Sequence, residues 1–232
     1  MTKNEFEMTS LRYNSSMRIL TVPEDMAVLR TKSQPVKTID AELIAFLRDL
    51  GKTLKHQKDP TGVGLSAIQI GRPIRAFATF LPEQRKKEEG RRKKDNPELV
   101  FYINPEIIGH PKDMTLGEDL VDPPKDRPSS HLGGQERSRP FLEGCLSIPD
   151  IYGPVLRWPW IQAKAVVVAE SDLSLPSAFS LQPSAFSLSG LTARVFQHEL
   201  DHLNGILFTD HTLAQGNQLY QDTGNGIEQI NL

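Results

Sequence analysis

The chain has 232 residues and is 38% hydrophobic, which is enough apolar material for one domain with a substantial core. Its 27 basic and 29 acidic side chains leave a net charge of −2, so the composition gives no general reason to expect DNA binding. The single cysteine, Cys145, excludes an internal disulfide, and no apolar run approaches the roughly 20 residues that span a bilayer. We therefore expect a cytoplasmic protein in a reducing compartment, without a membrane partner.

The first 16 residues are predicted to be a disordered leader, and they lack the apolar segment of a signal peptide. A more ordered-looking segment begins at Met17, and the sequence leaves open whether translation starts at Met1 or at Met17.

Hydrophobic spacing predicts the first regular elements. Residues 38–56 form an amphipathic pattern of helical period, with Thr38 as the expected N-cap. Apolar runs at 74–81, 100–108 and 163–169 predict strands, the second of them broken by Pro105.

Three stretches interrupt this pattern and are predicted to be surface insertions, at 82–98, 118–140 and 172–188. The first carries most of the clustered basic residues, which are typical of a solvated loop; contact with ribosomal RNA is the alternative. The third contains the hexapeptide PSAFSL twice, at 176–181 and 183–188, which indicates a local duplication in a loop. The polar tail at 213–232 is expected to be loose.

A second helix is predicted from Ser189, the expected N-cap, to Gly205, a residue suited to the C-terminal end. It carries the pattern H-E-x-x-H at His198, Glu199 and His202. Residues four apart lie on one face of a helix, about 6 Å apart, so two imidazoles at this spacing can bind one metal ion with the glutamate beside it. The alternative is a pair of histidines that serve only the surface or the core.

A metal site of this type needs a third ligand, and the sequence offers several places to look. One class of zinc proteases supplies a further histidine downstream, but here Phe208 stands at that position and cannot bind a metal. Another class uses a downstream glutamate, and the only one is Glu228, in the polar tail. Upstream, Cys145 lies in the segment EGCLS at 143–147; a lone cysteine is more often a small buried hydrophobe than a ligand. These last two alternatives stay open on the residues alone.

Taken together, three segments resemble the signature motifs of the peptide deformylases. GVGLSAIQ at 62–69, EGCLS at 143–147 and QHELDH at 197–202 occur in the family's order. Ser66 departs from the alanine that many relatives carry, and the three insertions put substrate specificity in doubt more than chemistry. The resemblance covers about residues 17–212, which we expect to form the deformylase domain.

The resemblance implies a divalent metal bound by Cys145, His198 and His202, with one coordination position left for water. Fe(II) is expected in the cell, and Zn(II), Ni(II) and Co(II) suit the same ligands. Glu199 would act as general base and then general acid.

The resemblance also implies two donors that stabilise negative charge on the formyl oxygen, the side-chain amide of Gln69 and the backbone N–H of Leu146. The substrates would be N-formylated nascent peptides, from which the enzyme removes the N-terminal formyl group and releases formate. Substrate contacts are expected from the first two motifs and from the helix, at Val63, Gly64, Leu65, Gly144 and Val195.

Two further expectations concern positioning. Val63 and Gly64 would pair with the extended peptide like an added strand. Asp201 and Arg157 could form an ion pair that fixes the helix relative to the cysteine strand; two unrelated surface charges are the alternative.

The expected fold is α+β, with small, mostly antiparallel sheets around a central helix that carries both histidines; the C-terminal helix of some relatives is not evident. Two rival functions remain, an H-E-x-x-H endopeptidase, which would not need Cys145, and a deformylase-like scaffold that only binds a partner.

Overall fold

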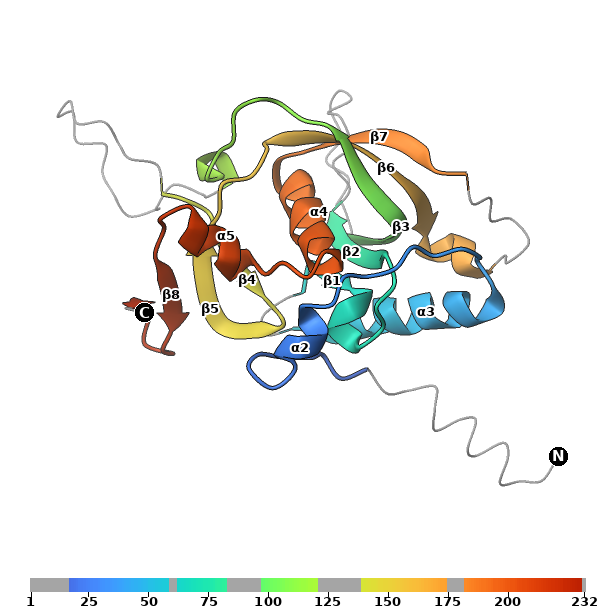
Figure 1. Ribbon diagram of the computed structural model, residues 1–232, viewed down its shortest axis with the longest axis horizontal. Helices are drawn as coiled ribbons and strands as arrows, with labels where there is room; N and C mark the ends of the chain where they lie inside the picture. The colour runs from blue at the N-terminus through green and yellow to red at the C-terminus, as the bar shows by residue number, and fades with distance from the viewer. Residues whose placement is uncertain (1–16, 59–61, 83–96, 121–138, 175–181, 231–232) are drawn as a thin grey trace, which may run out of the picture.

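The computed structural model describes residues 17–58, 62–82, 97–120, 139–174 and 182–230 (Figure 1). Two antiparallel sheets surround a helix that carries both histidines of the H-E-x-x-H pattern, which confirms the predicted α+β fold. Within these residues no helix is long and apolar enough to cross a membrane. The expected leader at 1–16 lies outside the described residues.

The larger sheet has the strand order β1-β2-β3-β6-β7 and the smaller one β4-β5-β8-β9. The strands of the larger sheet are β1 (Gly64–Ser66), β2 (Ala76–Pro82), β3 (Pro97–Gly109), β6 (Trp160–Ala169) and β7 (Ser184–Ser189). Those of the smaller sheet are β4 (Leu142–Cys145), β5 (Ile148–Pro154), β8 (Leu219–Asp222) and β9 (Ile227–Ile230). Short helical segments are α2 (Met26–Leu29), η1 (Ala67–Ile70), η2 (Glu118–Leu120), η3 (Glu170–Ser174) and α5 (Phe208–Ala214).

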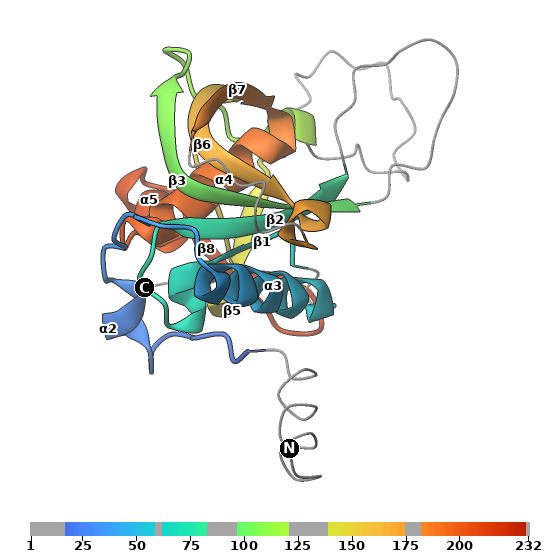
Figure 2. The same ribbon diagram turned by 90° about the vertical axis from the view of Figure 1, so that its right-hand side faces the viewer.

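Helix α3 (Ala41–His56) covers one face of the larger sheet (Figure 2). Its leucines pack on side chains that alternate along β2 and β3, among them Ala78 and Phe101. The expected cap at Thr38 is wrong by two residues: Asp40 is the N-cap, and its carboxylate accepts a hydrogen bond from the Leu43 N–H at 2.8 Å. A carboxylate is an effective cap because it also complements the positive end of the helix dipole.

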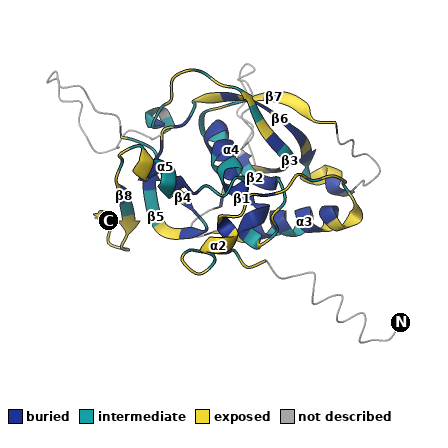
Figure 3. Ribbon diagram, in the orientation of Figure 1, coloured by how far each residue is buried: buried dark blue, intermediate teal, exposed yellow. Residues whose placement is uncertain are grey.

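Helix α4 (Gly190–Leu203) packs against the opposite face of that sheet and is buried along most of its length (Figure 3). The ring of Phe196 meets Phe77 and Tyr102 edge-to-face, with centroids 5.1 and 5.2 Å away. Gly205, just past the helix, has φ +73°, and a side chain there would overlap the backbone of Arg30. These contacts fix the position of α4, and with it the position of the histidines.

Strand β3 continues through Pro105 instead of breaking there. The register to β6 shifts between Ile103 and Glu106, so Pro105 lies in an irregularity of the ladder. Asn104, with φ 53°, bonds both backbone groups of Val36 through its side-chain amide. Proline is tolerated at such bulges because it need not donate to the ladder there.

The boundaries expected for the insertions are only partly right. Pro82 pairs with Pro97 and Leu81 with Glu98, so both ends of the first stretch belong to strands; residues 83–96 lie outside the description, as do 121–138 and 175–181. The second copy of the repeat is not a loop but strand β7 at the edge of the sheet. Its alternate residues Phe186 and Leu188 pack on the core beside α4.

The prediction of a loose C-terminal tail is wrong. Strands β8 and β9 form a hairpin, and β8 pairs with β5. Leu219 is buried in the cluster that also contains Cys145 and Phe208. Leu219 and Ile230 supply apolar contacts for this mostly polar segment. The edge of β5 supplies partners for its backbone hydrogen bonds, and together these contacts are sufficient to form the hairpin.

The hairpin should therefore stabilise the domain. We expect Leu219→Ala to lower the free energy of unfolding by about 2–4 kcal/mol, since it leaves a cavity beside α5. Leu213→Ala is the matched control, because Leu213 is 49% exposed and its loss should change stability by less than about 0.5 kcal/mol. Urea unfolding followed by circular dichroism measures both; equal effects would show that the hairpin does not contribute.

Candidate metal centre and pocket

The two histidines of α4 lie next to each other on the side of the helix that faces the smaller sheet. The ring centroids of His198 and His202 are 5.0 Å apart. His202 is buried, and His198 is only slightly exposed. Phe208, which occupies the position of the histidine ligand in one protease class, stacks on the ring of His198 at 6.2 Å. Glu228, the other ligand considered, is exposed on β9 and lies outside this cluster.

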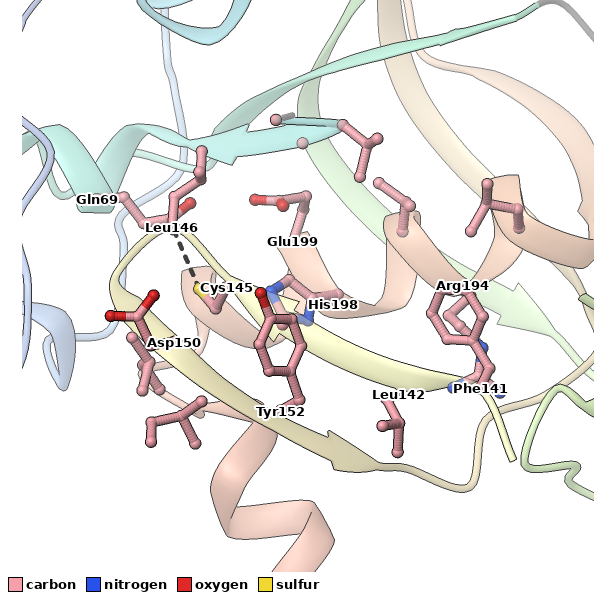
Figure 4. Close-up of a pocket in the computed structure, with 18 residues that line it drawn as sticks. Gln69, Phe141, Leu142, Cys145, Leu146, Asp150, Tyr152, Arg194, His198 and Glu199 are labelled. Atoms are coloured by element: carbon pink, nitrogen blue, oxygen red, sulfur yellow. Dashed lines mark hydrogen bonds between the residues drawn. The ribbon is translucent and has the colours of Figure 1, made fainter. Parts of the chain in front are cut away.

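Cys145 ends strand β4 and brings its thiol to the histidines. Its Sγ lies 3.1 Å from Nε2 of His202, and one ligand atom from each of Cys145, His198 and His202 lies within 4.8 Å of the other two. Cys145 and His202 are 57 residues apart in the chain, so tertiary packing alone brings these atoms together. Figure 4 shows the thiol of Cys145 beside the ring of His198, with a dashed line that joins it to the side chain of Gln69.

This donor set fits a tetrahedral metal ion. Metal–nitrogen and metal–sulfur bonds are about 2.0–2.3 Å long, so the donor atoms around such an ion lie roughly 3.5 Å apart. The distances between the donor atoms here, 3.1 Å for Cys145 and His202 and at most 4.8 Å for any pair, bracket that value. One thiolate and two imidazoles leave a fourth position for water or substrate. Imidazole and thiolate suit Fe(II), Co(II), Ni(II) and Zn(II) better than Mg²⁺ or Ca²⁺.

The electrostatics of the cluster favour a thiolate. Burial by itself raises the pKa of the Cys145 thiol, but the two adjacent imidazoles outweigh burial and hold that pKa well below its ordinary value. Burial lowers the pKa of His198, whereas the hydrogen bonds to Cys145 and Glu143 raise it well above its usual value. A divalent cation would take over the role of the imidazolium charge and stabilise the thiolate in the same way.

Glu143, on β4 two residues before the cysteine, anchors His198. Its Oε2 lies 3.2 Å from Nδ1 of His198, which leaves Nε2 of that ring for a metal. The same buried carboxylate accepts two hydrogen bonds from Arg157, at 2.9 and 3.0 Å, and one from Arg194 at 2.6 Å. Burial raises the pKa of Glu143, but Arg157 and His198 outweigh it, so the pKa stays well below its usual range.

Arg157 also pairs with Asp201 of α4, which confirms the ion pair that the sequence suggested. Asp201 accepts a further contact from Nε2 of His211, at 3.0 Å. Burial raises the pKa of Asp201, but Arg157 and His211 outweigh burial and bring that pKa below its usual value. The carboxylate therefore stays ionised. The network therefore ties β4, the segment after β5, α4 and α5 together around the metal ligands.

Glu199 lies on the same helix between the two histidines and is almost completely buried. Burial raises the pKa of its carboxyl group, and the neighbouring imidazoles reduce that rise. Its Oε1 lies against Gly64, where a Cβ would overlap the carboxylate, and its Oε2 accepts a hydrogen bond from the Ser66 hydroxyl at 2.6 Å. Only glycine at position 64 therefore lets β1 approach the helix this closely.

Gln69, in the short helix η1 after β1, points its side-chain amide at the cysteine. Its Nε2 lies 3.5 Å from Sγ of Cys145 and 3.1 Å from Oγ of Ser147 (Figure 4). Its Oε1 accepts the backbone N–H of Ser66 at 2.7 Å, which fixes the orientation of the amide. The donor end is thus the one that faces the cluster.

A pocket of about 210 Å³ opens beside the cluster. Aliphatic and aromatic side chains dominate its wall, and Cys145, His198 and Glu199 lie on its floor (Figure 4). Strand β1, which is an edge strand of the larger sheet, borders it on one side. Its other wall residues are Gly62, Val63, Gly64, Gln69, Phe141, Leu142, Gly144, Leu146, Ile148, Asp150, Ile151, Tyr152, Leu191, Arg194 and Val195.

Most residues singled out from the sequence line this pocket, with two exceptions. His202 lies behind it and contributes only to the cluster. Leu65 is fully buried in the core under α3, so its side chain offers no contact with a ligand in the pocket. Its neighbours Val63 and Gly64 both line the pocket.

Arg194 and Tyr152 in the wall, and Glu143 as the anchor of His198, were not predicted from the sequence. The signal available for Glu143 was its charge, because it lies next to Gly144 in a strand whose other residues are uncharged. Nothing in the spacing predicted that Arg194 would be buried, donating to Glu143 and to the backbone oxygen of Val155.

Comparison with known proteins gives a consistent result. Residues 16–218 match the family model described as polypeptide deformylase. The peptide deformylase of Wolinella succinogenes is 31% identical over 192 residues, which cover 83% of this chain and 85% of the relative. That of Rhizorhabdus wittichii is 35% identical over 183 residues, covering 79% and 80%.

Solved structures agree. The peptide deformylase of Thermotoga maritima superposes with a TM-score of 0.57 at 27% identity, covering 85% of this chain and 98% of that one. A Met-Ala-Ser-bound class I type b peptide deformylase from Acinetobacter baumannii superposes with a TM-score of 0.57 at 26% identity, with the same coverage.

Removing the charge of Glu143 should damage both stability and metal retention. We expect Glu143→Gln to cost roughly 3 kcal/mol of stability, because the buried Arg194 and Arg157 lose the carboxylate that they share, and Arg157 keeps only Asp201 among the described residues. Metal affinity should fall roughly 10- to 100-fold, because His198 loses its anchor. Glu170→Gln, at the exposed pair with Lys55, is the control and should change neither. Urea unfolding and chelator competition measure the two effects; unchanged metal retention would contradict the anchoring role.

Proposed function

The chain belongs to the polypeptide deformylase family, and on that premise we propose how its own residues carry out the family's reaction. The protein is a metal-dependent hydrolase that removes the N-formyl group from the N-terminal formyl-methionine of nascent polypeptides and releases formate. The observation that carries the residue assignments is the convergence of Cys145, His198 and His202, with Glu199 beside them, on the floor of one pocket.

The proposed metal ligands are Cys145, His198 and His202. Fe(II) is the metal proposed for the cell, with Zn(II), Ni(II) or Co(II) able to occupy the same ligands. When bound, the ion lowers the pKa of a water molecule and polarises the formyl oxygen. Because a thiolate ligand must stay reduced, we also propose that the protein works in the cytoplasm.

Glu199 is proposed as the group that moves the protons. It takes a proton from the water that attacks the formyl carbon, and it then delivers that proton to the amine that leaves. Burial supports this role, because it raises the pKa of the carboxyl group toward the range in which it can both accept and donate near neutral pH.

Two donors are proposed to stabilise the negative charge that develops on the formyl oxygen. One is the side-chain amide of Gln69, whose donor end faces the metal ligands. The other is the backbone N–H of Leu146, next to Cys145. Donors of this kind are typically worth about 3 kcal/mol each in the transition state.

The peptide is proposed to lie along the free edge of β1. Val63 and Gly64 would offer backbone groups to it as an added strand does, with Gly144 on the opposite side. The methionine side chain would enter the apolar part of the pocket, against Val195 and Phe141. The structure of the Acinetobacter baumannii enzyme with bound Met-Ala-Ser supports a ligand that begins with methionine.

The endopeptidase alternative has no support among the described residues. Its third ligand would be Glu228 or a histidine at 208, and Glu228 is exposed on β9 while position 208 is Phe208. A scaffold that only binds a partner would have no need for a thiol, two imidazoles and a buried glutamate around one point.

The decisive test is formate release from a formyl-Met peptide, with the unformylated peptide as control. We expect Glu199→Ala to lower kcat by roughly 10²–10⁴-fold, because proton transfer loses its carboxylate, while the metal stays bound. Cys145→Ser should instead lower or change metal content. Full activity of Glu199→Ala at normal metal content would refute the assignment of Glu199.

Contact with the ribosome stays a prediction, because the basic run at 85–94 lies outside the described residues. Replacing its lysines and arginines by serine is expected to reduce co-sedimentation with ribosomes, most visibly at low salt. Formate release from a short peptide should be unaffected. Unchanged co-sedimentation across salt concentrations would end the idea.

A further inference from the structure

Ser66 has no part in the reaction as proposed, yet its hydroxyl lies in direct contact with Glu199. The residue ends strand β1 and is completely buried. Its Oγ is 2.6 Å from Oε2 of the Glu199 carboxylate and 3.0 Å from the main-chain oxygen of the same residue. Ser66 does not line the pocket, so it has no direct access to a ligand bound there.

The same residue also orients the second polar group of the site. Its backbone N–H donates to Oε1 of Gln69, so the amide of Gln69 presents its Nε2 to Cys145. One residue of β1 thus contacts the carboxylate proposed to move protons and the amide proposed to bind the formyl oxygen. Ser66 is the place where these two groups are held relative to each other.

We propose that Ser66 is a positioning residue for Glu199, an inference that rests on the proposed role of Glu199. Its hydroxyl holds Oε2, which leaves Oε1, the oxygen against Gly64, at the edge of β1 that borders the pocket. A carboxylate held by one oxygen cannot rotate freely, and a fixed base loses less entropy on reaching the transition state.

A hydroxyl suits this task because its hydrogen can be donated to Oε2 whichever charge state Oε1 is in. While Glu199 is ionised, Ser66 donates its hydrogen to Oε2. When Oε1 carries the proton taken from water, Oε2 still accepts that hydrogen, and the main-chain oxygen of Glu199, 3.0 Å away, is a second acceptor for the same hydroxyl. Ser66 keeps its own proton throughout, and the carboxyl group keeps its place in both states.

The first test compares variants of position 66 by steady-state formate release. We expect Ser66→Ala to lower kcat roughly tenfold, as loss of one hydrogen bond to a charged group implies, with KM within about twofold. Ser66→Thr retains the hydroxyl and should recover most of kcat. Ser33→Ala removes a buried hydroxyl that has no partner among the described residues, and it should leave kcat unchanged. Wild-type kcat in Ser66→Ala would overturn the proposal.

A double-mutant cycle separates positioning from a merely structural role. If Ser66 acts through Glu199, adding Ser66→Ala to Glu199→Ala should leave the residual rate unchanged. A further loss of the same factor as in the wild-type background would overturn the proposal, whatever the behaviour of the threonine variant. Failure of the assigned Glu199 role would look different, because Glu199→Ala itself would then keep the wild-type rate.

Discussion

The site depends on one buried carboxylate. Glu143 joins the strand that carries Cys145 to the helix that carries His198, through contacts with Arg157, Arg194 and the ring of His198 itself. A buried charge is costly unless it is paired, so the elements that carry these partners must meet for any of them to be stable. The geometry of the metal ligands is therefore linked to the packing of the fold, not to local preferences of β4 or α4.

The larger sheet supports the site because its two faces cover different sets of buried residues. On one face, α3 covers an apolar core that contains no ionisable group of the site. On the other, aromatic contacts of Phe196 hold α4, which presents His198 and Glu199 to the pocket. Substrate and metal thus meet at the junction of the two sheets, where β1 has a free edge and β4 ends.

Because β1 lies close to α4, several residues of one short segment contact the polar groups of the site. Gly64 makes room for the Glu199 carboxylate, Ser66 contacts it, and Gln69 follows one turn later. The first motif thus combines substrate binding and the positioning of polar groups. The glycine at position 64 is required by this geometry, because a side chain there would overlap the Glu199 carboxylate.

The fold class and the type of reaction could be predicted from the sequence. Two histidines at helical spacing with a glutamate between them indicated a metal site, the resemblance of three motifs to one family implied Cys145 as the third ligand, and apolar runs predicted three of the strands. The burial of Arg194, the hairpin at 219–230 and the strand formed by the second repeat copy became known only from the tertiary structure. Those features depend on partners distant in the chain, and a local pattern carries no information about which strand edge or carboxylate will be available to meet it.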